Sequence, residues 1–260
     1  MMKKTILTSL VLAATLGTAS AQFKLNSKAI GAVGKGVKAA TFGDAEAAKL
    51  AKEAVDWMDE HNTVAGPKDP YTIRLNKIFD KHKNEDGLSL NYKVYKVVDI
   101  NAFACADGSV RVFSALMDKM TDQELLAIIG HEIGHVKNHD SRDAMRAAYK
   151  RAAISDAASS QSGAVNTLTQ SQLGDMANAI LESSYSRKQE SEADNFGYDF
   201  LKKHNYDVMA MASAFKKLQA LGSGDKKSTM QKMMSSHPDS GARAEEVEKK
   251  AKKDGLTKGE

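Results

Sequence analysis

Hydrophobic residues recur at helical spacing over most of the chain. In residues 44–61, Leu50, Ala51, Val55 and Met58 would share one broad face, and Asp44 is the predicted N-cap. Further segments with this spacing are predicted as helices over residues 70–83, 121–156, 175–203, 207–221, 227–235 and 240–253. The pattern therefore predicts a mostly α-helical protein.

The period changes to two between residues 90 and 116. Val94 and Val98 belong to one predicted strand, and Val110 and Val112 to another. Asp107-Gly108 is a tight-turn dipeptide between segments 102–106 and 109–114. We therefore expect an α+β fold that is mostly helical and compact, with a small antiparallel sheet of about three strands. Asn84 to Gly87 are expected to form a turn.

The first residues have the pattern of a secretory signal peptide. Lys3 and Lys4 precede an apolar run, which ends before the small residues Ala19-Ser20-Ala21. A membrane anchor is the alternative, but the run is about half of the roughly 20 residues that a bilayer requires. We expect cleavage after Ala21, which gives a signal peptide over 1–21, a flexible lead over 22–43 and one domain over 44–260.

Charge and cysteine content narrow the class of protein. The formal net charge of +4 comes from 37 basic and 33 acidic residues, and it falls to +2 without Lys3 and Lys4. A nucleic-acid partner therefore has no support. The single cysteine, Cys105, cannot form an intrachain bridge or serve as a lipid anchor at the cleavage site. We expect a soluble periplasmic or secreted protein, with Cys105 as a buried thiol.

One helix carries a metal-binding motif. Thr121 and Glu124 form a predicted capping box that starts the helix. Within it, His131 and His135 are four residues apart and share one face, and Glu132 can reach a water on a shared ion. This His-Glu-x-x-His pattern is the zinc peptidase signature. A partly exposed polar face is the alternative, but the apolar neighbours disfavour it.

A third protein ligand is needed for catalytic zinc. On a continuous helix, His139 lies about 12 Å of rise beyond His131 and is too far for one ion. Helical-wheel positions place Glu190, Asp194 and Gly197 on one inward face of a later helix. We predict Glu190 as the third ligand and Asp194 as the acceptor for a ligating histidine. Glu192 is expected to face water.

Three motifs in order resemble a known family. HEIGH at 131–135 is followed by ESEAD at 190–194 and by Ser-His-Pro at 236–238, and NAFACADGSVRVFSALM precedes them. Over residues 70–245 the chain resembles the HtpX, Oma and CAAX-prenyl-protease group of gluzincin metallopeptidases, and within it the periplasmic LoiP-like branch. Two departures are the missing lipidation cysteine and the unpaired Cys105.

The resemblance implies a set of roles. It makes His131, His135 and Glu190 the ligands of one Zn²⁺ per chain, and Glu132 the catalytic base. Asp194 then supports a ligating histidine. It also places the strand of Asn101, Ala102 and Phe103 along the cleft, where extended substrate would pair with it.

The expected function is hydrolysis of extended or misfolded envelope proteins by a zinc endopeptidase. His237 is a candidate transition-state donor, an alternative fourth ligand that excludes water, or an exposed turn residue. Polypeptides are the expected partners, with envelope proteins among them and no integral membrane span. Residues 155–174 are a candidate lid. A chaperone on the same fold and a metal-dependent hydrolase of another substrate stay open as alternatives.

Overall fold

The computed structural model describes residues 43–159, 169–222 and 236–257. The helices are α2 (Asp44–His61), α3 (Pro70–Phe79), η1 (Asp80–His82), α4 (Ser114–Lys119), α5 (Asp122–Lys137), α6 (Asp140–Ser159), α7 (Gln170–Leu181), α8 (Arg187–Lys203), α9 (Met209–Gly222) and α11 (Ser240–Asp254). The strands are β1 (Asn84–Glu85), β2 (Leu88–Ser89), β3 (Asn91–Tyr95), β4 (Ala102–Ala104) and β5 (Ser109–Phe113). The mostly helical α+β class is confirmed.

Several expectations fall beyond these ranges. The signal peptide over 1–21, the lead up to residue 42 and the predicted helix over 227–235 lie outside the described residues, as does the central part of the candidate lid, 160–168.

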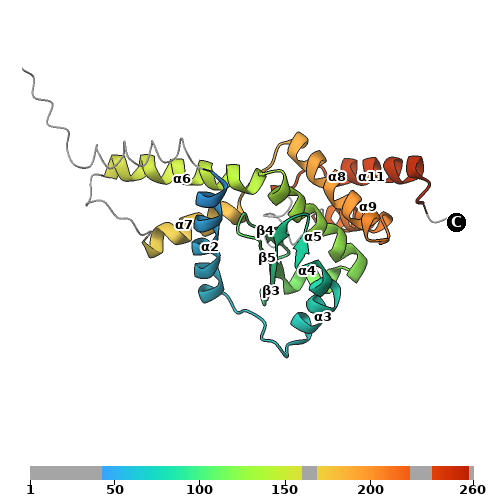
Figure 1. Cartoon of the computed structure of the whole chain (residues 1–260), viewed down its shortest axis with the longest axis horizontal. Coiled ribbons are helices and arrows are strands. Elements are labelled where there is room, and N and C mark those ends of the chain that lie inside the picture. The colour runs from blue at the N-terminus through green and yellow to red at the C-terminus, as the bar shows by residue number, and fades with distance from the viewer. Residues whose placement is uncertain (1–42, 160–168, 223–235, 258–260) are drawn as a thin grey trace, which may run out of the picture.

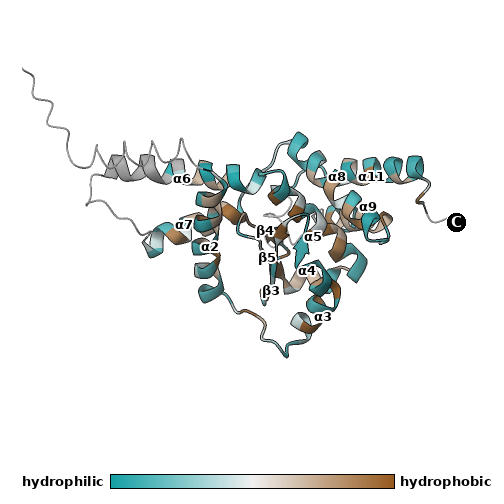
Figure 2. Cartoon of the chain, viewed as in Figure 1, coloured by the Kyte–Doolittle hydropathy of each residue, from teal (hydrophilic) through white to brown (hydrophobic). Residues whose placement is uncertain are grey.

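Helix α5 runs through the middle of the fold (Figure 1). It packs against α8 and α9 on one side and against β4 on the other, and α11 lies on α9. Helices α2, α6 and α7 pack on one another on the opposite side of the sheet. This arrangement encloses α5, and Figure 2 shows hydrophobic positions gathered around it and the sheet.

Burial of α5 follows from its sequence. Leu125, Ala127 and Ile128, which point in different directions around the helix axis, are 0%, 1% and 2% exposed, so the helix is buried on more than one face. Its start is the predicted capping box, since Glu124 donates its backbone N–H to Thr121 Oγ1 over 3.3 Å and accepts the backbone N–H of Thr121 over 2.8 Å. The local sequence thus fixes where the motif-bearing helix begins.

The three-stranded sheet is mixed. Its order is β3-β5-β4, with β4 antiparallel to β5 and β3 parallel to β5. The prediction of an all-antiparallel sheet is therefore wrong for β3. Alternating apolar residues indicate which face of a strand is buried, but they do not determine the direction of its neighbour. Because β5 lies between β3 and β4, strand β4 is at the edge of the sheet.

Two long predicted helices are divided. The helix expected over 121–156 is interrupted at His139, whose φ of +65° lies in the left-handed region. Such a residue ends an α-helix even when it is not glycine. The helix expected over 175–203 is likewise split into α7 and α8, with Ser186 as the N-cap of α8. These breaks matter because they place polar residues beside the metal motif.

Smaller differences occur at other boundaries. Helix α2 begins at Asp44 itself, with Gly43 as N-cap, one residue before the predicted cap. Helix α3 ends at Phe79 and continues as the short η1. The predicted turn at 84–87 is the bend of a hairpin between β1 and β2, in which Asp86 and Gly87 both have positive φ.

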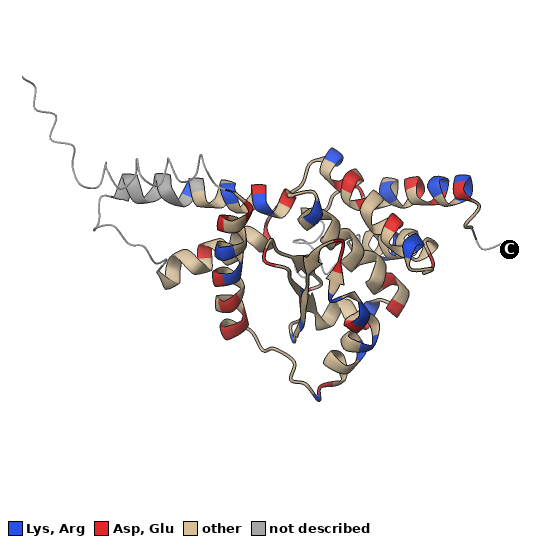
Figure 3. Ribbon diagram, in the orientation of Figure 1, with Lys and Arg blue, Asp and Glu red and all other residues tan. Residues whose placement is uncertain are grey.

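Charged residues of both signs are interspersed on the helices. Figure 3 shows blue and red positions alternating along α2 and α11. Among the described helices, none combines the length and the apolar character needed to cross a bilayer. Cys105 is a buried free thiol, as expected, and burial raises its pKa well above the usual value.

Candidate metal centre

Glycines allow α5 and α8 to approach closely. A Cβ atom on Gly197 would lie 2.9 Å from the backbone nitrogen of His131. A Cβ atom on Gly134 would lie 2.9 Å from the Cα atom of Ala193. Neither position has room for a larger residue without a shift of the helices. The close approach brings the histidine face of α5 against the acidic face of α8.

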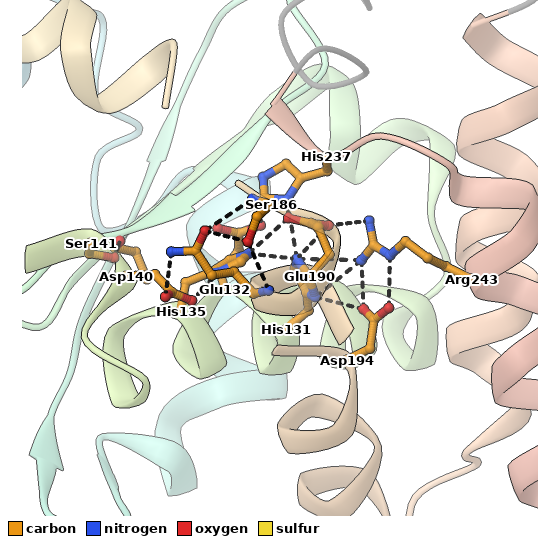
Figure 4. A network of polar contacts seen from close by, with 12 residues as sticks. His131, Glu132, His135, Asp140, Ser141, Ser186, Glu190, Asp194, His237 and Arg243 are labelled. Atoms are coloured by element: carbon orange, nitrogen blue, oxygen red, sulfur yellow. Dashed lines mark hydrogen bonds and ion pairs between the residues drawn. The ribbon is translucent and has the colours of Figure 1, made fainter. Parts of the chain in front are cut away.

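Four side chains converge between these helices. His131, His135, Glu190 and His237 each offer one ligand atom, and these atoms lie within 4.8 Å of one another (Figure 4). His135 Nε2 lies 3.0 Å from His131 Nε2 and 3.3 Å from Glu190 Oε1. His237 Nδ1 lies 3.0 Å from Glu190 Oε1. All four are buried, so the cluster is enclosed by protein.

Carboxylates hold the other ring nitrogens of the two α5 histidines. Asp194 Oδ1 lies 2.8 Å from His131 Nδ1, where the sequence had predicted this aspartate. Asp140 Oδ2 lies 2.9 Å from His135 Nδ1, and Gln189 donates to the other Asp140 oxygen over 2.8 Å. Such contacts fix the tautomer, which leaves both Nε2 atoms available to a metal ion.

Arg243 of α11 joins the two acidic residues of α8. Its Nε and Nη2 atoms lie 2.8 and 2.6 Å from the two oxygens of Asp194. Its Nη1 atom lies 2.5 Å from Glu190 Oε2. Burial alone would raise the pKa of Asp194, but the hydrogen bonds from Arg243 and His131 hold it below its usual value. Asp194 is therefore an ionised acceptor.

The carboxylate of Glu132 points at the same space. The residue is 3% exposed, and its Oε1 atom has no hydrogen-bond partner among the described residues. His237 Nε2 lies 3.5 Å from this oxygen, which is too far for a normal hydrogen bond. A buried carboxylate oxygen without a partner is costly. A water held by an ion at the neighbouring ligands would satisfy it.

The electrostatics of the cluster favour a cation. Burial alone would lower the pKa of His135, but hydrogen bonds with Asp140 and Glu190 raise it to about 9. Burial likewise opposes ionisation of Glu190, yet His135 and His237 hold its pKa far below the usual value. Imidazoles and a carboxylate are also the ligands that zinc prefers. The residues present thus fit a bound metal ion.

The edge strand β4 borders a cleft beside the cluster. Asn101, Ala102 and Phe103 line a cleft, together with Glu132 and His237. Apolar residues also line it, namely Ala144, Met145, Ile180 and Leu181. The predicted substrate strand and the predicted base therefore face the same space.

Other polar residues of the motif region lie elsewhere. The side chain of His139 is 52% exposed and pairs with Asp44 at 3.4 Å, so it is separate from the four-residue cluster. The exclusion of His139 as a ligand agrees with this position, but the continuous helix from which it was argued is wrong. Glu192 is 47% exposed, on the outer face of α8.

Three residues of the centre were not predicted from the sequence. Asp140 follows a helix break that was not predicted, although the all-polar run 137–143 was a signal for it. Tyr185 stacks on His135 with ring centroids 3.8 Å apart, and it lies in the second unpredicted break. Arg243 stands six positions after His237, on the first turns of α11. A polar residue on the inner face of a helix is the only local signal that Arg243 carries.

Comparisons with known proteins agree with this geometry. The family model described as Peptidase family M48 matches residues 74–251. Metalloprotease YcaL of Escherichia coli (strain K12) is 42% identical over 211 residues, which cover 81% of this chain and 82% of that protein. Metalloprotease LoiP of the same organism is 38% identical over 220 residues, covering 84% and 86%. Mitochondrial metalloendopeptidase OMA1 of Bos taurus is 26% identical over 74% of this chain and 40% of its own length.

Proposed function

The chain belongs to peptidase family M48 and is a metalloendopeptidase, and we propose that it is an exported zinc enzyme that cleaves extended or misfolded envelope proteins. The observation that carries this proposal is the convergence of His131, His135 and Glu190 beside Glu132, whose buried Oε1 atom has no hydrogen-bond partner among the described residues. These three residues would hold one Zn²⁺ ion at this centre.

Zinc, when bound, supplies an acidified water and polarises the scissile carbonyl. Glu132 accepts the proton of the attacking water and delivers it to the leaving amine. Asp194 and Asp140 keep His131 and His135 in the tautomers that ligate, through the contacts at 2.8 and 2.9 Å. The protein forms no covalent bond with the substrate in this scheme.

His237 has two alternative roles in this proposal. Its Nδ1 atom lies 3.2 Å from His131 Nε2 and 3.0 Å from Glu190 Oε1, so it would be able to hold a bound ion as a fourth ligand and exclude water. Where water takes that position instead, as catalysis requires, His237 would donate to the oxyanion of the transition state.

The edge strand supports a polypeptide substrate. Among the strands of the described residues, β4 is paired only with β5. An extended chain could add as the next strand along Asn101, Ala102 and Phe103, since main-chain pairing suits extended or unfolded polypeptide. The apolar wall around Met145 and Ile180 would hold a hydrophobic side chain of the substrate.

The site of action is inferred from the first residues. The lysines, the apolar run and Ala19-Ser20-Ala21 support export to the periplasm or the medium, with a mature catalytic domain over 44–260. No lipid anchor is proposed, because no cysteine follows Ala21 closely. Envelope proteins are then the available substrates.

A digestion assay tests the enzyme proposal. Purified native protein should degrade an unfolded protein such as casein, lose this activity with a chelator and regain it with Zn²⁺. Glu132→Gln should bind zinc as the native chain does, and its turnover should fall by about 10²- to 10⁴-fold. Cleavage by this variant at the native rate would refute the role of Glu132. Binding of unfolded protein with no digestion by the native chain would favour the chaperone alternative.

The assignment of Glu190 has a matched control on the same helix. Glu190→Gln should lose stoichiometric zinc at this centre, whereas Glu192→Gln, on the exposed face of α8, should retain it. Equal loss of zinc in both variants would show that the inward position of Glu190 is not what determines zinc binding.

A further inference from the structure

A second cluster of metal-ligand side chains lies at the other end of α8. It consists of His82 from η1, Glu85 from β1 and His204, the C-cap of α8. One ligand atom from each residue lies within 4.8 Å of the others. His82 and Glu85 are 1% and 3% exposed, and the side chain of His204 is 27% exposed. The cluster is thus buried, with one side open to solvent.

One oxygen of Glu85 contacts both histidines of the cluster. Glu85 Oε2 lies 3.2 Å from His82 Nδ1 and 3.0 Å from His204 Nε2. Tetrahedral zinc with ligand bonds of about 2.0 to 2.1 Å separates its donor atoms by about 3.3 Å. The donor atoms in the centre between α5 and α8 are separated by 3.0 and 3.3 Å. Both clusters therefore have the spacing of a zinc shell.

The remaining atoms of these residues are held by other partners. His82 Nε2 lies 2.8 Å from the hydroxyl of Tyr206, which fixes the ring and leaves Nδ1 to ligate. Lys203 Nζ lies 2.5 Å from Glu85 Oε1 and 2.9 Å from Asp86 Oδ1. Lys203 thus occupies the other carboxylate oxygen, and Glu85 can offer Oε2 to an ion.

A bound ion also suits the protonation states of the cluster. The ring centroid of His82 lies 4.5 Å from that of His204, so the two imidazoles are close enough to share one cation. Burial opposes ionisation of Glu85, but Lys203, His204 and His82 keep its pKa below the usual value.

We propose that His82, Glu85 and His204 form a second metal site, which takes Zn²⁺ or a similar divalent ion. Its fourth position is open to water on the exposed side of His204. The ion links the β1–β2 hairpin to the C-terminal end of α8, the helix whose first turns carry Glu190. The site has no part in the peptidase proposal, and it can exist whether or not that proposal holds.

A hydrogen-bonded ion-pair network without metal is the competing explanation, and zinc stoichiometry separates the two. Titration of the metal-free full chain with Zn²⁺ against a chromophoric chelator should give two ions per native chain and one for His204→Ala. His135→Ala should also bind one, and the double variant none. His61→Ala, a change at an exposed histidine outside both clusters, should retain two. One ion per native chain, or two in His204→Ala, would overturn the second site.

Thermal unfolding supplies a second readout that does not depend on activity. In the His135→Ala background, Zn²⁺ should raise the Tm, because an ion that binds only the folded state stabilises it. Glu85→Gln in the same background should abolish this shift. Circular dichroism of each variant checks that it folds, and His204→Asn serves if His204→Ala does not. A Tm that does not respond to Zn²⁺ in the His135→Ala chain would contradict the proposal.

Discussion

Arg243 donates to both carboxylate oxygens of Asp194, with its Nε atom 2.8 Å from Oδ2 and its Nη2 atom 2.6 Å from Oδ1. Asp194 Oδ1 in turn lies 2.8 Å from His131 Nδ1. A two-point contact of this kind fixes the plane of the carboxylate, which a lysine ammonium could not do. The orientation of His131, a proposed metal ligand on α5, thus depends on a residue of α11.

Loss of the two-point contact should weaken metal binding. We expect Arg243→Lys to lower zinc affinity at this centre by about 10- to 100-fold, because the ligating ring loses its fixed orientation. Asp194→Asn should have a similar effect. Competition titration against a chelator of known affinity measures the change. Lys250→Ala, on the same helix and bonded to Asn195 and Asp199 at the surface, is the control and should bind zinc normally.

Water access to the metal should depend on His237. Co²⁺ can replace Zn²⁺ as a spectroscopic probe, and a metal-bound water in such a site ionises near pH 7. With His237 in the fourth position, the visible spectrum of the native centre should not change with pH around neutrality. His237→Ala should introduce a transition with a midpoint of about 7. Both chains carry His204→Ala, so that the second cluster contributes nothing.

The opposite pH dependence of the Co²⁺ spectrum would exclude His237 as the fourth ligand. A transition near neutral pH in the chain with His237 would mean that water already occupies the fourth position. His237 would then act only as a donor to substrate, and His237→Ala should lower turnover without changing the spectrum.

A methyl group added at the contact between α5 and α8 should lower the stability of the fold. A Cβ atom on Gly197 would lie 2.9 and 3.2 Å from the backbone nitrogen and Cα atom of His131, neither of which can move alone. Gly197→Ala should therefore cost about 1 to 3 kcal/mol in unfolding free energy. Urea denaturation measures it. Gly66→Ala, where an added Cβ meets nothing within 4 Å, is the control, and equal costs would contradict the argument.

Local spacing explains what could be predicted of the centre. His131, Glu132 and His135 lie on one helix, so their relation follows from 3.6 residues per turn. Glu190 and Asp194 were separated from Glu192 by the same arithmetic, and the structure places them inward. The sequence contains no comparable rule for Arg243, since it meets Glu190 only after α11 has packed near α8.

The prediction from the sequence failed mainly at the breaks between helices and at the direction of one strand. Residues 137–143 are all polar, and the prediction of one continuous helix passed over this run, so it missed His139 as the left-handed residue that ends α5. The missed break concealed Asp140, which lies 2.9 Å from His135 only because the chain turns there. The parallel pairing of β3 with β5 is likewise a result of tertiary packing, because alternation carries no information about direction.

Acid should weaken the attachment of α2 to the sheet. Asp59 of α2 accepts hydrogen bonds from Arg111 at 2.8 and 2.9 Å, from Tyr95 at 2.7 Å and from Lys93 at 2.6 Å. Burial alone would raise the pKa of Asp59, but these partners lower it from 3.8 to about 2. A folded-state pKa below the unfolded value gives stability that is complete above about pH 4 and is lost as the pH falls to about 2.

Asp59→Asn removes the part of the pH dependence of stability that comes from this carboxylate. The difference in unfolding free energy between native and variant chains should shrink by about 2 kcal/mol from pH 5 to pH 2, since the native carboxylate becomes protonated over that range. Urea denaturation at several pH values measures it. Asp56→Asn changes an aspartate on the same helix whose side chain is 56% exposed, and its difference from the native chain should stay nearly constant. A constant difference for Asp59→Asn as well would show that the charge of Asp59 does not hold α2 against β3 and β5.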